Sequence, residues 1–390
     1  MRSVLLLLLL TAFPSIVSTK YERRVLLISL DGFRHDLLNE TLVPHMHKFA
    51  DRSSWFVNGV EKHLLKIFRT SFEFQDKHGI IGNFFWDRSK QEMYDKFHST
   101  GGPDLRAESE MSKWNPIDPI WLLNRRNGGQ STVINWPAGD YERSERVGVR
   151  MTRYRMPFGF NNDWPKELEM VLNALETDNL VLWYIAEPDS TLHEHGFYDG
   201  KLEKKLRELD ELFYSLMTQM HHRGLLNSTD ITLTADHGHI QFEYKVEQIF
   251  KRVHKISIHS SISQVGNANI YSSNATLVNE MYQKLKQAID MDGLPYKVYL
   301  QKDVPASWHY VNADRTGDIV IETLPGGNVW MHCNSTPDDS HSSSHGHSPN
   351  WPEMHALLVL SGPSFNEATK IDRIPENIDL FPLMRRLLQI

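Results

Sequence analysis

Three apolar runs of this 390-residue chain end directly in acidic residues. The runs are residues 25–30, 181–186 and 231–235, and the acidic residues after them are Asp31, then Glu187 and Asp189, then Asp236. In open α/β sheets, ligands bind beyond the carboxyl ends of the strands, so three such ends would bring these carboxylates to one edge. Because like charges that lie so close repel one another, a positive group is expected between them.

Histidines stand beside these acids in the sequence. His237 directly follows Asp236, His193 lies four residues after Asp189, and His345 lies in the loop before the last apolar run. Four residues make about one helical turn, so Asp189 and His193 would point the same way on a helix.

Together, six side chains offer the donors that divalent cations of intermediate softness prefer. The expected ligands are Asp31, Asp189, His193, Asp236, His237 and His345. They suit two ions, each with an open position, and zinc is the leading candidate. Two ions about 4 Å apart can hold the attacking and leaving oxygens of a phosphate ester. The pattern therefore favours phosphoryl or phosphodiester transfer.

Each pattern also has a plainer interpretation. Asp-Gly after a strand is commonly a turn, a single Asp-x-x-x-His commonly lies on a solvated surface, and the Ser- and His-rich residues 332–347 are typical of a surface loop. It is their joint placement that favours metal chemistry. Other classes lack their signatures, because the sequence has no His-Glu-x-x-His of a zinc protease and no Gly-rich loop of the P-loop type.

The elements that would position these residues alternate between short Val-, Ile- and Leu-rich runs and helical patterns. Such alternation is typical of an α/β fold with a mostly parallel central sheet flanked by helices. Apolar residues recur at helical spacing from Leu202 to Met220, and Gly224 then ends the pattern. Residues 242–329 are less regular, which indicates a smaller inserted lobe.

The first residues have the order of a secretory signal. Arg2 precedes an apolar run, and small residues follow, so we expect residues 1–18 to be a signal peptide and residues 19–390 to form the catalytic domain of a secreted protein. Elsewhere no apolar stretch reaches the roughly 20 residues that span a membrane. Glycosylation sequons agree with export, and they begin at Asn39, Asn227, Asn274 and Asn334.

The charged-residue composition limits the kinds of partner that the protein is expected to bind. There are 42 Lys and Arg against 49 Asp and Glu, for a net charge of −7, so no nucleic-acid polymer is expected to bind. Cys333 is the single cysteine, so no intramolecular disulfide can form.

The ordered motifs of the chain resemble those of a known family. They are LDGFR at 30–34, EPDS at 187–190 followed by His193, DHG at 236–238, SHG at 344–346 and SGPSF at 361–365, with further matches at 78–83, 118–121, 135–137 and 314–319. From about Arg24 to the C-terminus, the chain resembles the ecto-nucleotide pyrophosphatases/phosphodiesterases, a branch of the alkaline phosphatase superfamily. The resemblance implies an alkaline phosphatase-like fold and a metal-dependent phosphodiesterase.

The resemblance also implies roles for individual residues. It divides the expected ligands between two zinc ions, with one set formed by Asp31, Asp236 and His237 and the other by Asp189, His193 and His345. By the same resemblance, Asn83 would donate a hydrogen bond to a non-bridging phosphate oxygen. Trp136 would lie near the substrate pocket.

The nucleophile segment departs from the family pattern. Family members carry a threonine, activated by metal coordination, that attacks phosphorus. In this chain several residues of that motif and of the helix after it are absent. Thr70 stands near the expected separation from Asp31, and Ser71 precedes a phenylalanine as the family's threonine does, so either hydroxyl is a candidate. We take Thr70 as the expected nucleophile.

Three hypotheses result. The first is a secreted, two-zinc phosphodiesterase that acts on small-molecule nucleotides, dinucleotides or choline-type phosphodiesters. The second is a glycoprotein that keeps the fold and the metal ligands but is catalytically impaired. The third is an incomplete gene model that lacks a stretch near Thr70. A monoesterase or sulfatase relative is a minor alternative.

Overall fold

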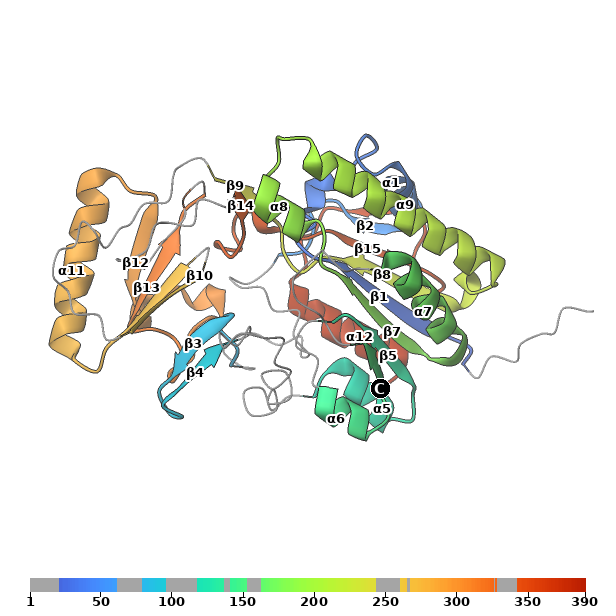
Figure 1. Cartoon of the computed structure of the whole chain (residues 1–390), viewed down its shortest axis with the longest axis horizontal. Coiled ribbons are helices and arrows are strands. Elements are labelled where there is room, and N and C mark those ends of the chain that lie inside the picture. Colours follow the sequence, from blue (N-terminus) through green and yellow to red (C-terminus); the bar gives the residue numbers. More distant parts are fainter. Residues whose placement is uncertain are drawn as a thin grey trace, which may run out of the picture.

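The computed structural model describes residues 21–61, 79–95, 118–136, 141–152, 163–242, 260–264, 267–325, 327 and 342–390. The predicted signal peptide, Thr70, Ser71 and Cys333 lie outside these residues. Figure 1 shows a larger body, built around a long sheet, beside a smaller body that carries α11 (Ala275–Asp292). Among the described residues, no helix has the length and apolar character needed to cross a membrane.

The larger body is organised by an eight-stranded sheet with the order β16-β2-β15-β8-β1-β7-β5-β6. Strand β15 is antiparallel to both neighbours and the other pairs are parallel, which confirms the predicted mostly parallel sheet. The strands are β1 (Arg24–Leu30), β2 (Ser54–Phe56), β5 (Ser131–Ile134), β6 (Arg150–Thr152), β7 (Leu180–Ile185), β8 (Thr229–Thr234), β15 (Leu358–Ser361) and β16 (Thr369–Ile371).

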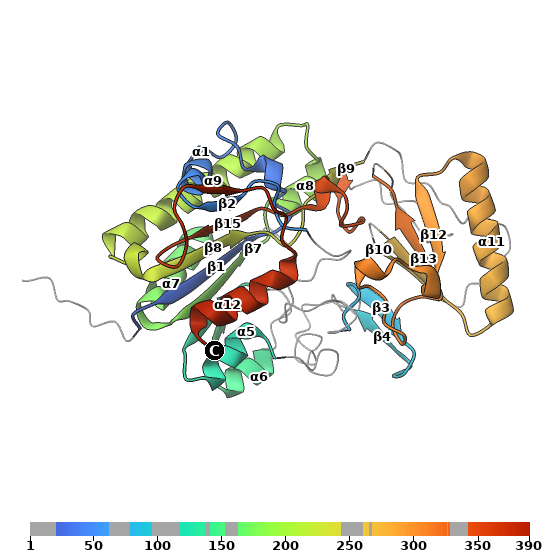
Figure 2. The same cartoon turned by 180° about the vertical axis from the view of Figure 1, so that it is seen from behind.

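Helices cover both faces of this sheet (Figures 1 and 2). One face carries α1 (Pro44–Asp51), α7 (Trp164–Thr177) and α9 (Lys201–His222), and the other carries α5 (Ile120–Arg126), α6 (Tyr141–Arg146) and α12 (Leu380–Leu388). Every residue of β1, β7 and β8 is buried, because both faces of these strands are covered. Helix α9 confirms the predicted helix between β7 and β8, and Gly224 follows it with φ +68°.

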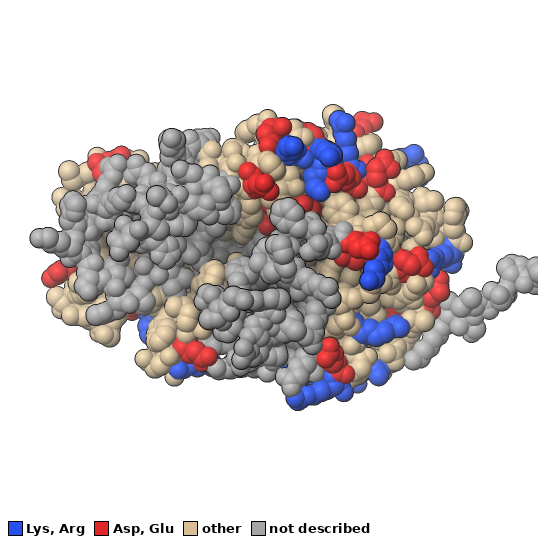
Figure 3. All heavy atoms as spheres, in the orientation of Figure 1, with Lys and Arg blue, Asp and Glu red and all other residues tan. Residues whose placement is uncertain are grey.

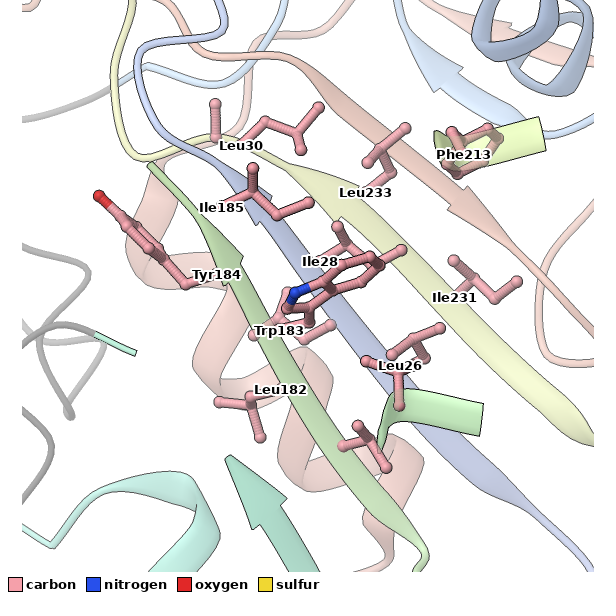
Figure 4. Packing of buried hydrophobic residues seen from close by; sticks show 14 of the residues in the cluster. Leu26, Ile28, Leu30, Leu182, Trp183, Tyr184, Ile185, Phe213, Ile231 and Leu233 are labelled. Atoms are coloured by element: carbon pink, nitrogen blue, oxygen red, sulfur yellow. The ribbon is translucent and has the colours of Figure 1, made fainter. Parts of the chain in front are cut away.

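Successive side chains of a strand point to opposite faces of the sheet, so Trp183 and Tyr184 of β7 make different contacts. Figure 4 shows Tyr184 directed away from the side of β7 that carries Trp183. Trp183 Nε1 donates to Glu167 Oε2 of α7 at 3.0 Å. The Tyr184 hydroxyl, in contrast, reaches the carboxylates beyond the strand ends.

The smaller body has its own antiparallel sheet and cores on both sides of it. The sheet order is β10-β11-β13-β12, formed by β10 (Ser260–Gln264), β11 (Asn267–Tyr271), β13 (Ile319–Thr323) and β12 (Tyr296–Leu300). Ile319 and Ile321 pack with residues of α11, whereas Val320 belongs to a second cluster with Phe85 and Tyr94. Those two aromatic residues come from the hairpin of β3 (Phe84–Asp87) and β4 (Glu92–Asp95). A hairpin from outside residues 242–329 therefore packs on the sheet of the smaller body, and the predicted lobe at 242–329 stays a prediction.

The remaining elements are short. A two-stranded ribbon pairs β9 (Ile240–Gln241) with β14 (Ser343–Ser344), and α8 is Asp189–His195. The 3₁₀ turns are His35–Leu37, Leu226–Ser228, Gln301–Asp303, Ala306–Trp308, Pro352–Met354 and Asn377–Asp379. Figure 3 shows acidic and basic side chains interspersed over the visible face of the larger body, without a single-sign patch.

Candidate metal centre

Three neighbouring strands bring the predicted carboxylates together. β8, β1 and β7 are adjacent in the sheet, and Asp236, Asp31 and Asp189 follow their carboxyl ends. All three residues are at most 4% exposed. Asp189 N donates to the carbonyl oxygen of Asp31 at 2.9 Å, and Gly32 N donates to Asp236 Oδ1 at 3.1 Å. The backbone thus links the three strand ends directly.

One group of donor atoms consists of Asp31, Asp236 and His237, whose ligand atoms lie within 4.8 Å of one another. His237 Nε2 is 3.2 Å from Asp31 Oδ1 and 3.7 Å from Asp236 Oδ2. The Tyr184 hydroxyl donates to Asp31 Oδ2 and lies 3.4 Å from Asp236 Oδ2. This group therefore has two carboxylates, one imidazole and a supporting phenol.

A second group is formed by Asp189, His193, His239 and His345, again within 4.8 Å of one another. Helix α8 places Asp189 and His193 one turn apart, with His193 Nε2 at 3.4 Å from Asp189 Oδ1. The β9–β14 ribbon places the two other histidines, with His345 Nε2 at 3.6 Å and His239 Nε2 at 2.9 Å from the same oxygen. His237 Nε2 is 3.7 Å from Asp189 Oδ1, so the two groups adjoin.

Hydrogen bonds hold the rings of His193 and His237 so that the Nε2 atom of each faces the carboxylates. His193 Nδ1 lies 3.1 Å from the carbonyl oxygen of Ser343, and His237 Nδ1 lies 2.8 Å from that of Gly238. Because a carbonyl only accepts, each Nδ1 donates, and in the neutral ring each Nε2 keeps its lone pair. Within the described residues, the buried Nε2 of His237 has no hydrogen-bond partner. Metal-binding histidines are usually fixed in this way, so the donors fit divalent ions.

Burial shifts the pKa of two groups near the centre. It lowers the pKa of His239 to about 3, so that ring is neutral at pH 7. It raises the pKa of Glu187, the other acidic residue after β7. Glu187 Oε2 accepts a hydrogen bond from Thr191 N at 3.1 Å, and Lys205 Nζ lies 3.9 Å from Glu187 Oε1. Glu187 therefore supports the first turn of α8 and stands outside both donor groups.

The predicted residues for catalysis and substrate binding lie in three different places. Thr70 is outside the described residues. Asn83 is half-buried and directly precedes β3, on the hairpin of the smaller body. Trp136 is 1% exposed, and its ring meets Tyr184 edge to face with centroids 5.9 Å apart. Tyr184 therefore contacts Trp136 with its ring and Asp31 with its hydroxyl. The role of Trp136 in substrate binding stays a prediction.

Two residues of the centre were missed by sequence reasoning. His239 had a signal, because it is a further imidazole two residues after His237, but nothing in the sequence tells which donors it meets. Tyr184 had none, because a tyrosine in an apolar run is typical of ordinary core. Tyr184 reaches the centre from near the end of β7, and His239 reaches it from the position just before β9.

Comparison with solved structures defines the fold. An inactive form of murine ectonucleotide pyrophosphatase/phosphodiesterase 5, in complex with AMP, has a TM-score of 0.78 at 22% identity and covers 94% of this chain and 95% of that chain. The human protein of that name also has a TM-score of 0.78, at 24% identity. The chain therefore has an alkaline phosphatase-like α/β fold, as predicted.

Comparison of sequences gives the family. The family model described as Type I phosphodiesterase / nucleotide pyrophosphatase matches residues 73–348, so the chain belongs to this family of hydrolases. Human bis(5'-adenosyl)-triphosphatase ENPP4 is 24% identical over 394 residues, which cover 97% of this chain and 81% of that protein. Human ectonucleotide pyrophosphatase/phosphodiesterase family member 5 is 25% identical over 378 residues, or 95% and 75% of the two chains.

Proposed function

We propose that this protein is an extracellular phosphodiesterase that hydrolyses small nucleotide-type phosphodiesters with two zinc ions. The observation that carries the proposal is the pair of adjoining donor groups, joined by the 3.7 Å approach of His237 Nε2 to Asp189 Oδ1. Asp31, Asp236 and His237 would hold one ion. Asp189, His193 and His345 would contribute to the other.

The protein's own residues prepare this site for a phosphate ester. Three carboxylates at most 4% exposed are unfavourable together without cations, so the apo site is poised to bind metal. Bound zinc would supply Lewis-acid stabilisation of the phosphoryl oxygens. Tyr184 fixes the orientation of Asp31, and the carbonyl oxygens of Ser343 and Gly238 fix the rings of His193 and His237.

The roles of three further residues belong to the same proposal. The hydroxyl of Thr70 would attack phosphorus, and Asn83 would donate a hydrogen bond to a non-bridging phosphate oxygen. Trp136 would border the pocket from behind Tyr184, on which it packs. Replacing Thr70 by Ala should abolish turnover while Ser71→Ala retains it. The reverse result would move the nucleophile to Ser71.

The substrate class rests on the relatives, among them the human protein named bis(5'-adenosyl)-triphosphatase ENPP4. Bis(5'-adenosyl) triphosphate and a nitrophenyl ester of a nucleoside monophosphate are therefore suitable substrates for a test. Hydrolysis should stop with a chelator and return with Zn²⁺. Secretion and glycosylation can be checked on the same preparation, because enzymatic removal of N-glycans should lower the apparent mass of protein recovered from the medium.

An equally buried aspartate outside the centre makes the test specific. Asp236→Asn should reduce hydrolysis by a factor of about 100 or more, because a metal ligand and its charge are lost. Asp210→Asn should not, because this equally buried residue lies on α9, accepts hydrogen bonds from His45 N and Met46 N, and stands outside both donor groups. Zinc binding without hydrolysis above the Asp236→Asn level would favour the catalytically impaired glycoprotein.

A further inference from the structure

His239 lies in the middle of the second donor group. Its side chain is fully buried, and its Nε2 is 2.9 Å from Asp189 Oδ1. Its ring contacts those of His193 and His345 edge to face, with centroids 4.7 and 5.2 Å away. The Nε2 atoms of His193, His345 and His237 lie farther from Asp189 Oδ1, at 3.4, 3.6 and 3.7 Å.

The hydrogen bonds of Ser343 determine which nitrogen of His239 carries the proton. Ser343 Oγ lies 2.6 Å from the carbonyl oxygen of Leu192, to which it donates its single hydroxyl proton. His239 Nδ1 lies 3.1 Å from the same Oγ and must therefore be the donor in that contact. The Nε2 of the neutral ring then keeps a lone pair directed at Asp189 Oδ1. Two lone pairs at 2.9 Å repel each other unless one cation binds both atoms.

We infer that His239 is a fourth protein ligand of the metal ion at Asp189, together with His193 and His345. The inference rests on the proposed two-metal function and adds to it a ligand of the second ion. The chain then supplies one carboxylate and three imidazoles to that ion. Four protein donors are a number that zinc commonly takes, and the bound ion would supply Lewis-acid stabilisation to a phosphate oxygen. The group of Asp31, Asp236 and His237 would keep its open position.

The backbone explains how His237 and His239, which are only two residues apart, would bind different ions. Gly238 N donates to the carbonyl oxygen of Met354 at 2.9 Å. A Cβ on Gly238 would collide with the carbonyl oxygen of Glu353, so only glycine allows this close passage. The chain then enters β9, whose pairing of Ile240 with Ser344 brings His239 beside β14.

Another role for His239 would be that of a positioning residue whose ring carries both protons, so that Nε2–H donates to Asp189 Oδ1. His239→Gln separates the two roles, because a glutamine amide can donate that hydrogen bond but supplies no imidazole nitrogen. His355→Gln is the matched control. His355 is a buried histidine, 6% exposed, whose ring nitrogens face the carbonyl oxygens of Asn58 and Pro349, and it lies outside both donor groups.

The experiment is a titration of the metal-free, full-length protein with Co²⁺, followed by visible absorption and by proton NMR of the shifted imidazole N–H signals. In the wild type, the first equivalent should give the intense absorption of four-coordinate Co²⁺. His239→Gln should lose this spectrum and one shifted N–H signal. Its affinity for the first equivalent should fall by more than about 100-fold, beyond the 10- to 100-fold that the loss of an outer partner produces. His355→Gln should match the wild type.

The outcomes separate the two proposals. If His239→Gln keeps the wild-type spectrum and its N–H signals, the assignment of His239 as a ligand is overturned, whatever the affinity. If the wild type binds no Co²⁺, the two-metal function fails first, and with it this inference. If two ions bind and hydrolysis is measured while His239→Gln is spectroscopically unchanged, the proposed function stands and His239 is a positioning residue only.

Discussion

Gly32 and Asp189 lie so close that a side chain on Gly32 would have no room. A Cβ on Gly32 would be 2.9 Å from Asp189 Cβ and 3.0 Å from Asp189 Cα, and Gly32 has φ +72°. Glycine is therefore required for two reasons, the left-handed backbone and the close approach of the β7 end to the β1 end. This approach brings the Asp189 group beside the Asp31 group.

Gly32→Ala should destabilise the protein and weaken metal binding together. The left-handed conformation costs an alanine about 1–2 kcal/mol, and the displaced Asp189 adds about 1–3 kcal/mol of overpacking. Gly224→Ala is the control, because Gly224 has φ +68° but a Cβ added there would have no described atom within 4 Å. Urea unfolding and Zn²⁺ titration of both variants check this. Equal losses of stability and unchanged zinc affinity in the two variants would contradict it.

Tyr184→Phe should weaken zinc binding with little loss of structure. The hydroxyl donates to Asp31 Oδ2, and removal of such an outer partner typically lowers metal affinity about 10- to 100-fold. Tyr299→Phe is matched, because it also removes a hydroxyl bonded to a carboxylate, Glu322 Oε2 at 2.8 Å, but in the smaller body. Competition with a chromophoric chelator measures both affinities. The prediction fails if both variants bind Zn²⁺ like the wild type.

Removal of metal should lower the stability of the folded protein. Asp31, Asp189 and Asp236 are buried at adjoining positions, and cations relieve their repulsion in the folded state only. At a free Zn²⁺ concentration 100-fold above Kd, the gain is about 2.7 kcal/mol per site. Thermal unfolding with chelator and with Zn²⁺ measures it. The zinc-dependent gain should shrink in Asp236→Asn but persist in Asp210→Asn, and an equal gain in both would speak against these ligands.

Glu322 should make stability depend on pH. This residue of β13 is 2% exposed, and burial raises the pKa of its carboxyl above the ordinary value of 4.5. Its stabilising contribution is therefore complete below the unfolded pKa and is lost as the pH rises through the folded pKa. Glu322→Gln removes that loss, so its free energy of unfolding relative to the wild type should increase with pH over this window. Urea unfolding at several pH values measures the difference.

Glu280→Gln is the control for this pH dependence. Glu280 is an exposed residue of α11 in the same body. Its replacement should leave the pH profile of the wild type unchanged. A profile of Glu322→Gln that runs parallel to that of the wild type would rule out Glu322 as the titrating group.

The amino-acid sequence predicted the sheet and much of the candidate metal centre, because both depend on local rules. Buried parallel strands are recognisable as apolar runs, and their carboxyl ends share one edge, so Asp31 and Asp236 were expected to meet. The spacing of Asp189 and His193 equals one turn of a helix, and α8 forms there. The packing of the β3–β4 hairpin on the smaller sheet had no such local signal, because Phe85 and Tyr94 meet Val320 only through tertiary packing.

By itself, the sequence determined the family, the α/β fold and the six side chains that were expected to gather. These follow from periodicity and from the order of motifs, which the chain carries without folding. The tertiary structure alone decided that His239 joins Asp189, that Tyr184 supports Asp31, and that Gly32 has no room for a side chain. The physical reason is that these contacts join residues from different elements. Strand pairing and backbone approach set them, and no local spacing encodes them.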